Sequence, residues 1–270
     1  MKASRIFLFL IVPILLASPA PAQNAERLKA VIDSDARRPK NKLRDVYRHP
    51  FETLMFMGIE PSMTVVEIWP GRGWYSEILA PYLAGSGRLY AAGWDRNLTS
   101  GYVQKTLKAY ADKYIGKPEI YGDVILTELS RNKTEIAPPG SADMVLTFRS
   151  VHNWMKRGYE ATIFEAMYRA LKPGGVLGVV EHRGDPETWQ DPQALSGYVN
   201  EEYVIGLAEE AGFSLAGRSE VNANPKDTAD YPEGVWTLPP TLRLREKDRD
   251  YYLDIGESDR MTLKFIKPEV

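Results

Sequence analysis

Short apolar runs alternate with longer amphipathic segments along most of this chain, and this alternation limits which folds it can adopt. Six runs have the length and composition of buried strands: residues 64–69, 88–93, 142–148, 175–181, 213–221 and 261–267. Helical patterns lie between them at residues 74–83, 99–114, 160–171 and 201–212. One further strand, the third along the chain, is placed at residues 119–123. Strands that alternate with helices predict an α/β protein, a doubly wound sheet with helices on both faces.

The first 22 residues have the features of a secretory signal. Two basic residues precede an apolar run at residues 6–17, and Ala20 and Ala22 form the small-residue pattern of a cleavage site. The run is shorter than the ~20 residues that a membrane span needs. The sequence therefore predicts cleavage after Ala22, with no stable membrane anchor left behind. Residues 23–270 are expected to form a single domain in the periplasm or outside the cell.

The charge balance of the chain is mildly acidic. Of 34 basic side chains, cleavage removes Lys2 and Arg5, so 32 face 36 acidic ones and the formal net charge becomes −4. A surface of this kind is not expected to bind nucleic acid. The chain has no cysteine, which excludes disulfides, thiolate metal sites and a lipidated cysteine. Export without disulfides suits a bacterial periplasm.

The first predicted strand runs into a glycine loop and then into a helix. The stretch EIWPGRGW covers residues 67–74 and contains Gly71 and Gly73. Glycine lets the backbone approach a ligand closely, and a helix N-terminus offers free N–H groups to an anion. In a doubly wound sheet, ligands bind outside the carboxyl ends of the strands. These residues therefore form a candidate cofactor-binding loop.

The pair Trp69-Pro70 interrupts this loop. A residue before proline is pushed toward extended conformations, so we expect the strand to continue through Trp69 before the chain turns. The indole could line a ligand pocket, or it could pack under the helix, since aromatic side chains mostly supply buried area. The sequence leaves both interpretations open.

Segments along the whole chain resemble those of the class I S-adenosylmethionine-dependent methyltransferases. In order and spacing they are VVEIWPGRGWYSEIL, GRLYAAGWD, IYGDV, GSADMVLTFRSVHNW, ALKPGGVLGVVEHR and EEAGF. FRSVHNW, NPKDTADYPEGVWTLPP and the ending SDRMTLKFIKP are similar to a group of exported bacterial proteins classed as predicted methyltransferases. The resemblance covers residues 43–268. It implies a Rossmann-like sheet of seven strands, mostly parallel, whose last strand is antiparallel.

The resemblance implies S-adenosylmethionine as the cofactor. It makes Glu67 the acidic residue at the end of the first strand, and it places Gly71 and Gly73 against the methionine part of the cofactor. Asp123 is expected near the adenine.

Two positions depart from the pattern of this family. Trp69 stands in place of the first glycine of the loop, and Gly93 stands in place of the acid that holds the ribose hydroxyls. Asp95 lies two residues further and is the candidate substitute. Cofactor binding by this chain therefore depends on Trp69 and Asp95.

The predicted strand that ends at Phe148 is followed by a second polar loop, with Arg149, His152 and Asn153. In methyltransferases of this fold, such a position borders both the transferred methyl group and the acceptor. Methyl transfer needs positioning, and it needs a base when the acceptor is a poor nucleophile. Histidine is a common base because its unperturbed pKa lies near ~6.5. His152, Arg149, Asn153 and His49, which precedes the first strand, are therefore the candidate catalytic residues.

Each of these residues also has a structural alternative. A histidine could simply hold a hydrogen bond, and a zinc site of three histidines lacks the usual ligand spacing, so no metal is expected. Arg149 and Arg183 could clamp an acidic acceptor, or they could pair with Glu67 or Glu181 and hold the strand ends together. The turn-rich segment at residues 222–236 could be a lid or a plain surface loop.

Three functions remain open from the sequence. The first is a methyltransferase that acts on a small molecule or on a component of the cell envelope. The second is a binding protein that keeps the fold without turnover, because the cofactor loop is altered and the cofactor is made in the cytosol. The third is an NAD-dependent oxidoreductase, because residues 71–76 approximate GxGxxG, although Ser76 replaces its last glycine.

Overall fold

Seven strands form one sheet at the centre of the computed structural model, which describes residues 20–269. The strands are β1 (Thr64–Ile68), β2 (Arg88–Gly93), β3 (Val124–Glu128), β4 (Ala142–Phe148), β5 (Leu171–His182), β6 (Ser214–Ser219) and β7 (Arg260–Ile266). Their order across the sheet is β3-β2-β1-β4-β5-β7-β6. β7 runs antiparallel to both of its neighbours, and the other pairs are parallel. This confirms the expected α/β sheet of seven strands with an antiparallel last strand.

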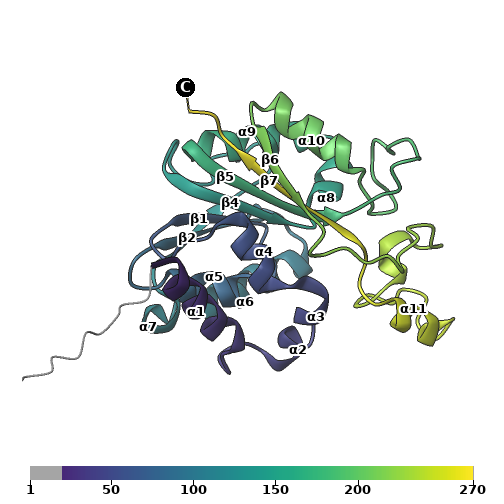
Figure 1. Cartoon of the computed structure of the whole chain (residues 1–270), viewed down its shortest axis with the longest axis horizontal. Coiled ribbons are helices and arrows are strands. Elements are labelled where there is room, and N and C mark those ends of the chain that lie inside the picture. The colour runs from purple at the N-terminus through teal and green to yellow at the C-terminus, as the bar shows by residue number, and fades with distance from the viewer. Residues whose placement is uncertain (1–19, 270) are drawn as a thin grey trace, which may run out of the picture.

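Helices cover both faces of the sheet (Figure 1). One face carries α8 (Val151–Met155), α9 (Glu160–Ala170) and α10 (Glu201–Glu210). The other face carries α1 (Ala20–Asp33), α4 (Pro50–Met57), α5 (Ser76–Leu83), α6 (Gly101–Tyr114) and the single turn α7 (Pro118–Tyr121). Three short elements lie outside these layers: α2 (Pro39–Lys42), α3 (Asp45–Arg48) and α11 (Arg249–Ile255). Two separate apolar clusters result, one on each side of the sheet.

The central strands are buried on both faces. β1 carries Val65, Val66 and Ile68, all with at most 1% exposure, so its apolar residues are continuous instead of alternating. Such a run is typical of a parallel strand between two helix layers. α9 shows the matching helical pattern, because Ile163, Phe164 and Met167 lie on one buried face.

The position predicted for the third strand is wrong. Residues 118–121 form the turn α7, and the strand follows at Val124–Glu128. β3 lies at the edge of the sheet, and each of its residues is only partly buried. An edge strand needs no continuous apolar run, which explains why the apolar pattern pointed to neighbouring residues.

The apolar run predicted as part of a secretory signal, residues 6–17, lies outside the described residues. The cleavage site expected after Ala22 falls in the first turn of α1. Among residues 20–269, no helix is long and apolar enough to cross a membrane.

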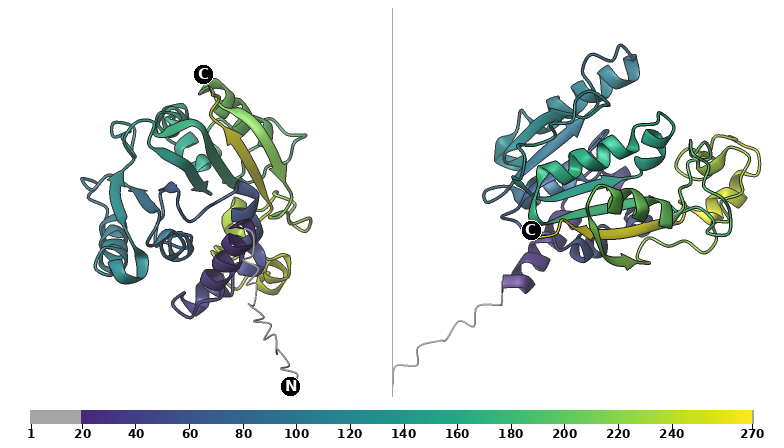
Figure 2. Two further views of the ribbon diagram at one scale, coloured as in Figure 1. Left: turned by 60° about the vertical axis from the view of Figure 1, so that its left-hand side comes forward. Right: turned by 90° about the horizontal axis from the view of Figure 1, so that it is seen from above.

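The long connection between β6 and β7 extends beyond the end of the sheet (Figure 2). It contains the short 3-10 helix η1 (Gly234–Thr237) and α11. Because β7 is antiparallel to β5, this connection returns to the sheet at its carboxyl edge, where Arg260 pairs with His182. The connection is therefore placed to cover the loops that follow β1 and β4.

Candidate functional site

Two loops at the carboxyl edge begin in the same unusual way. The β1 loop (residues 69–75) starts at Trp69 with φ of 45°, and the β4 loop (residues 149–153) starts at Arg149 with φ of 58°. Left-handed backbone is unfavourable for side chains of this size and persists only where the surroundings hold it. Strain of this kind often accompanies ligand sites. Both loops were predicted as site loops, and the structure brings them to one edge of the sheet.

Glu67 ends deep inside the protein beneath the β1 loop. Its carboxyl group accepts a hydrogen bond of 2.5 Å from the Ser76 hydroxyl, which in turn accepts one of 2.9 Å from Tyr110. Burial raises the pKa of Glu67 to about 8, and the bond from Ser76 offsets only part of this. Glu67 is therefore mainly protonated at neutral pH. Its carboxyl group supports the start of α5 through Ser76.

Trp69 does not continue the strand as expected. Its backbone N–H still bonds to Ala92 at 2.9 Å, but its φ is left-handed, so the chain turns one residue earlier than predicted. The indole N–H donates to the carbonyl of Leu129 at 3.1 Å, and the ring packs edge-on against Trp94 and Trp154. Trp69 also forms one wall of a cavity. Trp69 therefore lines a cavity, but it packs against Trp94 and Trp154 and not under the helix that follows the loop.

The cavity beside Trp69 has a volume of about 330 Å³ and lies between the β1 loop, the end of β2 and α6. We call it the cofactor-side cavity, because the β1 loop is the candidate cofactor loop of the sequence. Its walls include Trp69, Gly71, Gly93, Trp94 and Tyr110. The size is within the range of small-ligand pockets, and aromatic side chains suit a planar base. A methyl group added to Gly71 would meet no protein atom within 4 Å, so this glycine borders open space.

Gly73 has a different, structural role in the same loop. Its φ is 75°, its N–H bonds to the carbonyl of Pro70 at 2.8 Å, and its own carbonyl accepts a bond of 2.8 Å from the Tyr114 hydroxyl. The Tyr114 ring occupies the space that a side chain at this position would need. Gly73 therefore shapes the loop, while Gly71 faces the open space.

Of the two acids expected to hold the adenosine, one lies at the wrong edge of the sheet. Asp123 precedes β3, at the opposite edge of the sheet, where it pairs with Arg88 at 3.6 Å. The acid at the carboxyl end of β3 is Glu128, which the sequence analysis missed because the strand was placed too early. Asp95 does lie at the correct edge. It accepts a bond of 2.8 Å from Lys133, which also pairs with Glu128.

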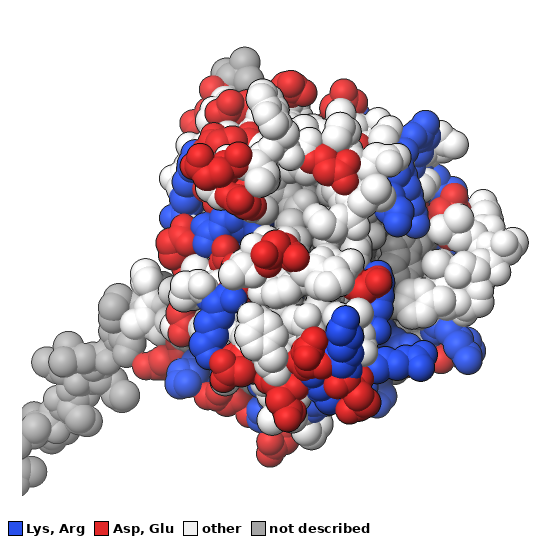
Figure 3. Space-filling view, turned by 90° about the vertical axis from the view of Figure 1, so that its right-hand side faces the viewer, with Lys and Arg blue, Asp and Glu red and all other residues white. Residues whose placement is uncertain are grey.

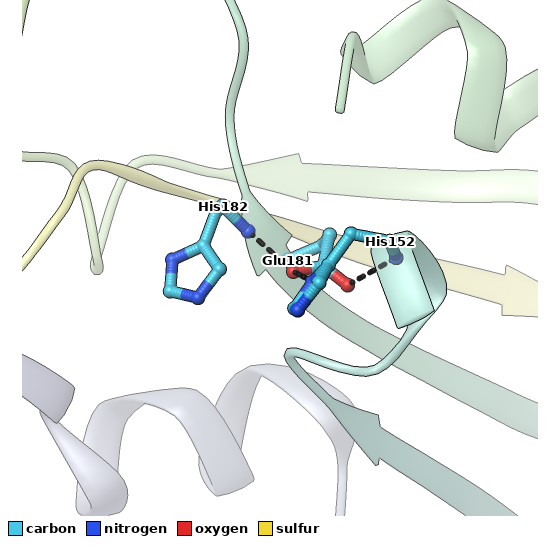
Figure 4. A group of neighbouring side chains, drawn as sticks. All are labelled: His152, Glu181 and His182. Carbon is cyan, nitrogen blue, oxygen red and sulfur yellow. Dashed lines mark hydrogen bonds and ion pairs between the residues drawn. The ribbon is translucent and has the colours of Figure 1, made fainter. Parts of the chain in front are cut away.

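The β4 loop carries a histidine that is oriented by a buried acid. His152 Nδ1 lies 3.0 Å from Glu181 Oε1, and Glu181 also accepts backbone bonds from Val151 at 2.6 Å and from His182 at 2.8 Å. Figure 4 shows Glu181 between the two histidines. Because a carboxylate only accepts, Nδ1 carries the proton and Nε2 keeps its lone pair. The Asn153 amide occupies that lone pair at 2.8 Å.

His182 lies beside this pair and stays neutral. Burial lowers its pKa well below the usual value, and the nearby charges of Arg149 and Arg260 act in the same direction. Its Nδ1 hydrogen-bonds with the Ser258 hydroxyl at 2.5 Å. The two imidazole centroids are 5.5 Å apart, so both rings border one small volume.

His152, Glu181 and His182 could also offer ligand atoms to a metal ion, because these atoms lie within 4.8 Å of one another. Two observations oppose a cation there. Both oxygens of Glu181 already accept backbone N–H groups. The positive charge of Arg149 also acts on His182, and it would repel a cation bound there. The electrostatics of this group therefore favour an anion or a neutral ligand.

Four arginines gather next to the histidines, and we call Arg44, Arg48, Arg149 and Arg260 the arginine cluster. Three of them contact Glu257: Arg44 through Nε, Arg48 through Nε at 3.3 Å, and Arg260 through Nη2 at 2.5 Å. Burial opposes ionisation of Glu257, but the charges of Arg48 and Arg260 and the bond from Arg44 outweigh it and lower the pKa to about 2. Glu257 is thus fully ionised at neutral pH.

The remaining sequence candidates have separate positions. His49 lines a second cavity of about 330 Å³, together with Asn222, Glu257 and Ser258, and Ser258 in turn bonds to His182. Arg183 pairs with Asp259 at 2.9 and 3.0 Å. It therefore forms a structural ion pair at the strand ends, but with Asp259 and not with the expected Glu67 or Glu181.

The segment at residues 222–236 covers the β4 loop. η1 brings the Trp236 ring within 6.0 Å of His152, and Arg243 lies over the outer face of that indole at 4.7 Å. The lid interpretation is the one that fits these contacts. Figure 3 shows the side of the molecule on which α11 lies. Basic and acidic side chains are mixed there, with uncharged surface between them.

The sequence analysis missed Glu181 as the partner of His152, and it missed Arg48, Arg260 and Glu257. Glu181 and His182 are the last two residues of β5, so their place at a strand end was a usable signal. The other three come from segments about 200 residues apart in the chain, for which no local pattern exists.

The sequence matches no protein-family model and no curated protein sequence. Solved structures with the same fold are found. An S-adenosylmethionine-dependent methyltransferase from Aquifex aeolicus aligns with a TM-score of 0.53 and 19% identity, over 73% of this chain and 93% of that one. Phosphoethanolamine N-methyltransferase 2 of Haemonchus contortus, in complex with S-adenosyl-L-methionine, gives 0.54 and 17%, over 83% and 53%.

A third similar structure is the (4+2)-cyclase SpnF, with a TM-score of 0.59 and 14% identity over 93% of this chain and 95% of that one. Identities this low concern the fold alone. The chain therefore has the Rossmann-like fold of class I methyltransferases. Its antiparallel β7 differs from the order of dinucleotide-binding folds, which argues against the oxidoreductase alternative. SpnF indicates that the fold itself does not fix the reaction.

Proposed function

We propose that this protein is an S-adenosylmethionine-dependent methyltransferase, exported from the cytosol, that acts on a small molecule or on a component of the cell envelope. The observation that carries the proposal is the His152–Glu181 pair at 3.0 Å, next to the loop edge where this fold binds its ligands. An oriented, buried imidazole whose second nitrogen carries a lone pair, here held by the Asn153 amide, is the arrangement of a general base.

The residues of the cofactor-side cavity fit the proposed cofactor. Gly71 borders open space, so the methionine part of the cofactor would lie against its backbone without meeting a protein side chain. Trp94 and Tyr110 offer apolar walls for an adenine. Asp95 is not part of the cavity wall but follows the end of β2, and its carboxylate is the candidate partner for ribose hydroxyls. Lys133 already binds Asp95, so the carboxylate would share its hydrogen bonds between Lys133 and the ribose.

When bound, S-adenosylmethionine would supply an electrophilic methyl group. The protein would then orient an acceptor and remove its proton. His152 Nε2 accepts that proton, and the acceptor takes the place of the Asn153 amide at this nitrogen. Glu181 stabilises the imidazolium that forms and holds its orientation, as acids do in other base pairs of this kind. Trp236 and the connection around it exclude water from the site.

A binding protein without turnover is the second candidate, because Trp69 already packs across the β1 loop and Lys133 already occupies Asp95. Two glycines provide a matched test. Gly71 and Gly140 have φ of 58° and 64°, and a methyl group added to either would meet no atom within 4 Å. Gly71→Ala and Gly140→Ala therefore impose a similar backbone strain, but only Gly71 borders the proposed cofactor site.

We expect S-adenosylhomocysteine to bind the wild type and Gly140→Ala equally, and Gly71→Ala at least about tenfold more weakly, as measured by calorimetry. Equal binding by both variants would remove the β1 loop from the site. No heat from the wild type, at ligand concentrations well above millimolar, would contradict the proposal as a whole.

Turnover separates an enzyme from a binding protein. Cell-envelope extracts incubated with methyl-labelled cofactor and the wild-type protein should contain a labelled product in mass spectra. With His152→Gln, we expect product formation to fall by about 10²- to 10⁴-fold while affinity for S-adenosylhomocysteine stays unchanged, because His152 acts on the acceptor. Loss of affinity in the same proportion would indicate a structural role for His152.

A further inference from the structure

Resting on the proposed methyltransferase function, we infer that the acceptor carries an oxyanion, a carboxylate or a phosphate, and that the Arg149 guanidinium binds it beside His152. The inference depends on a surplus of buried positive charge in the arginine cluster, on an unpaired guanidinium, and on the position of Arg149 three residues before the proposed base.

The charges of the arginine cluster are not balanced by the protein. Arg48 and Arg260 are each 2% exposed, and with Arg44 they share the single carboxylate of Glu257. Buried charges are costly unless they are paired, and one carboxylate neutralises one of three guanidinium groups. A ligand with negative charge would offset part of the remaining positive charge.

Hydrogen-bond donors also outnumber acceptors there. Among the described residues, Arg44 Nη2, Arg48 Nη2 and Arg260 Nε are buried nitrogens without any acceptor. Buried donors normally find a partner, and leaving one unpaired costs about 1 to 3 kcal/mol. The excess of donors indicates a region arranged for an additional group with several acceptor oxygens.

Arg149 is the member of the cluster that remains open to a ligand. It is partly exposed, and among residues 20–269 its one hydrogen bond is the backbone bond to Val180, with none from the guanidinium. The other acid in reach, Glu181, is occupied by His152 and by backbone N–H groups. Burial, together with the charge of Arg260, lowers the pKa of Arg149 to about 10, and Arg149 still stays charged at neutral pH.

The backbone conformation at Arg149 fixes the position of this residue relative to His152, the proposed base. Its N–H donates to the carbonyl of Val180 at 2.7 Å, next to Glu181, and its φ of 58° holds the chain in a sharp turn before α8. His152 follows three residues later. Tyr75 stacks on Phe148 at 3.5 Å and forms an apolar neighbour of the same loop. An oxyanion on Arg149 would thus bring the rest of a small acceptor toward His152.

The test uses inorganic phosphate and acetate as probes of the mature protein, titrated by calorimetry at constant ionic strength. Arg149→Gln removes the charge, and Arg149→Lys keeps it. Arg245→Gln is the matched control, because Arg245 has the same φ of 58° but is exposed. The thermal midpoint of each variant, measured alongside, confirms that it is folded.

We expect at least one of the two anions to bind the wild type and Arg245→Gln equally, and Arg149→Gln about tenfold more weakly. Arg149→Lys should restore most of the affinity. Preference for phosphate indicates a phosphate ester as acceptor, and preference for acetate indicates a carboxylate. Equal binding by Arg149→Gln, or no binding by the wild type at ~50 mM of either anion, overturns the inference.

Binding of S-adenosylhomocysteine to the same samples separates two kinds of failure. If it binds but no anion depends on Arg149, only the inference about the acceptor is wrong. If an anion depends on Arg149 but S-adenosylhomocysteine does not bind, the methyltransferase proposal fails, and the guanidinium remains an anion site of another function.

Discussion

Two buried carboxyl groups at the ligand edge behave in opposite ways. Glu67, under the β1 loop, is 2% exposed, and its partner is the hydroxyl of Ser76. Glu257, beside the β4 loop, is 3% exposed, and its partners are three arginines. Burial raises the pKa of Glu67 to about 8, whereas the guanidinium groups lower that of Glu257 to about 2. At neutral pH, Glu67 is therefore mainly protonated beneath the β1 loop, whereas Glu257 is ionised beside the β4 loop.

This difference divides the edge into two electrostatic environments. The cofactor side has aromatic walls and a carboxyl group whose neighbours are hydroxyls. The proposed acceptor side has an arginine cluster with one carboxylate, Glu257, among four guanidinium groups. A neutral loop discriminates little between ligands of different charge, whereas a charged loop favours ligands of the opposite charge. The specificity of this protein is therefore expected to lie with the acceptor.

The largest effect on this comparison is expected from Glu257→Gln. It leaves Arg44, Arg48 and Arg260 without a carboxylate, and removal of one partner from a buried ionic group costs about 3 to 5 kcal/mol. Urea unfolding at neutral pH measures this loss. Glu220→Gln is the control, because Glu220 pairs with Arg183 at the surface, and we expect it to cost less than about 1 kcal/mol.

The pH dependence of the same variant gives a second measurement. The folded pKa of Glu257, about 2, is below its unfolded value, so its contribution to stability is complete above about pH 4.5 and is lost as the pH falls toward 2. The difference between wild type and Glu257→Gln should shrink over that window. A difference that stays constant down to pH 3 would mean that Glu257 is not an ionised partner of the cluster.

A smaller effect, of opposite sign, is expected from Glu67→Gln. The folded pKa of Glu67 is above its unfolded value, so wild-type stability falls as the pH rises from about 4.5 to about 8. Glutamine has no charge to bury, and the variant should be more stable than the wild type by about 2 to 4 kcal/mol at pH ~8.5. Near pH 5 the two should unfold at nearly equal urea concentrations. A variant that is less stable at both pH values would show that the Ser76 bond requires a carboxylate.

Most of the sheet could be predicted from the sequence because central strands are buried on both faces. Residues 142–148, whose centre is the apolar run Met144-Val145-Leu146, became β4 with the same bounds. β3 could not be located in this way, since it lies at the sheet edge and is only partly buried. The same error misplaced the acid of that strand, so Asp123 was expected where Glu128 lies.

The candidate site could be predicted only where its residues follow a strand directly. Arg149, His152 and Asn153 lie just beyond β4, and strand ends meet at one edge of a parallel sheet. The arginine cluster could not be predicted, because Arg44 and Arg48 precede β1, whereas Glu257 lies just before β7 and Arg260 is its first residue. Only the return of the long connection to the carboxyl edge brings these residues together.

The smallest effect is expected from Arg149→Asn, and it tests whether this residue serves a ligand or the fold. Asparagine tolerates left-handed backbone better than arginine, and the change also removes a charge from the cluster. We therefore expect the variant to be more stable than the wild type by about 1 kcal/mol while it loses phosphate binding. Arg245→Asn has the same φ of 58° on an exposed loop, so it measures the backbone effect alone. If Arg149→Asn is the less stable of the two in urea, Arg149 stabilises the fold, and the contrast between the two loops loses its functional meaning.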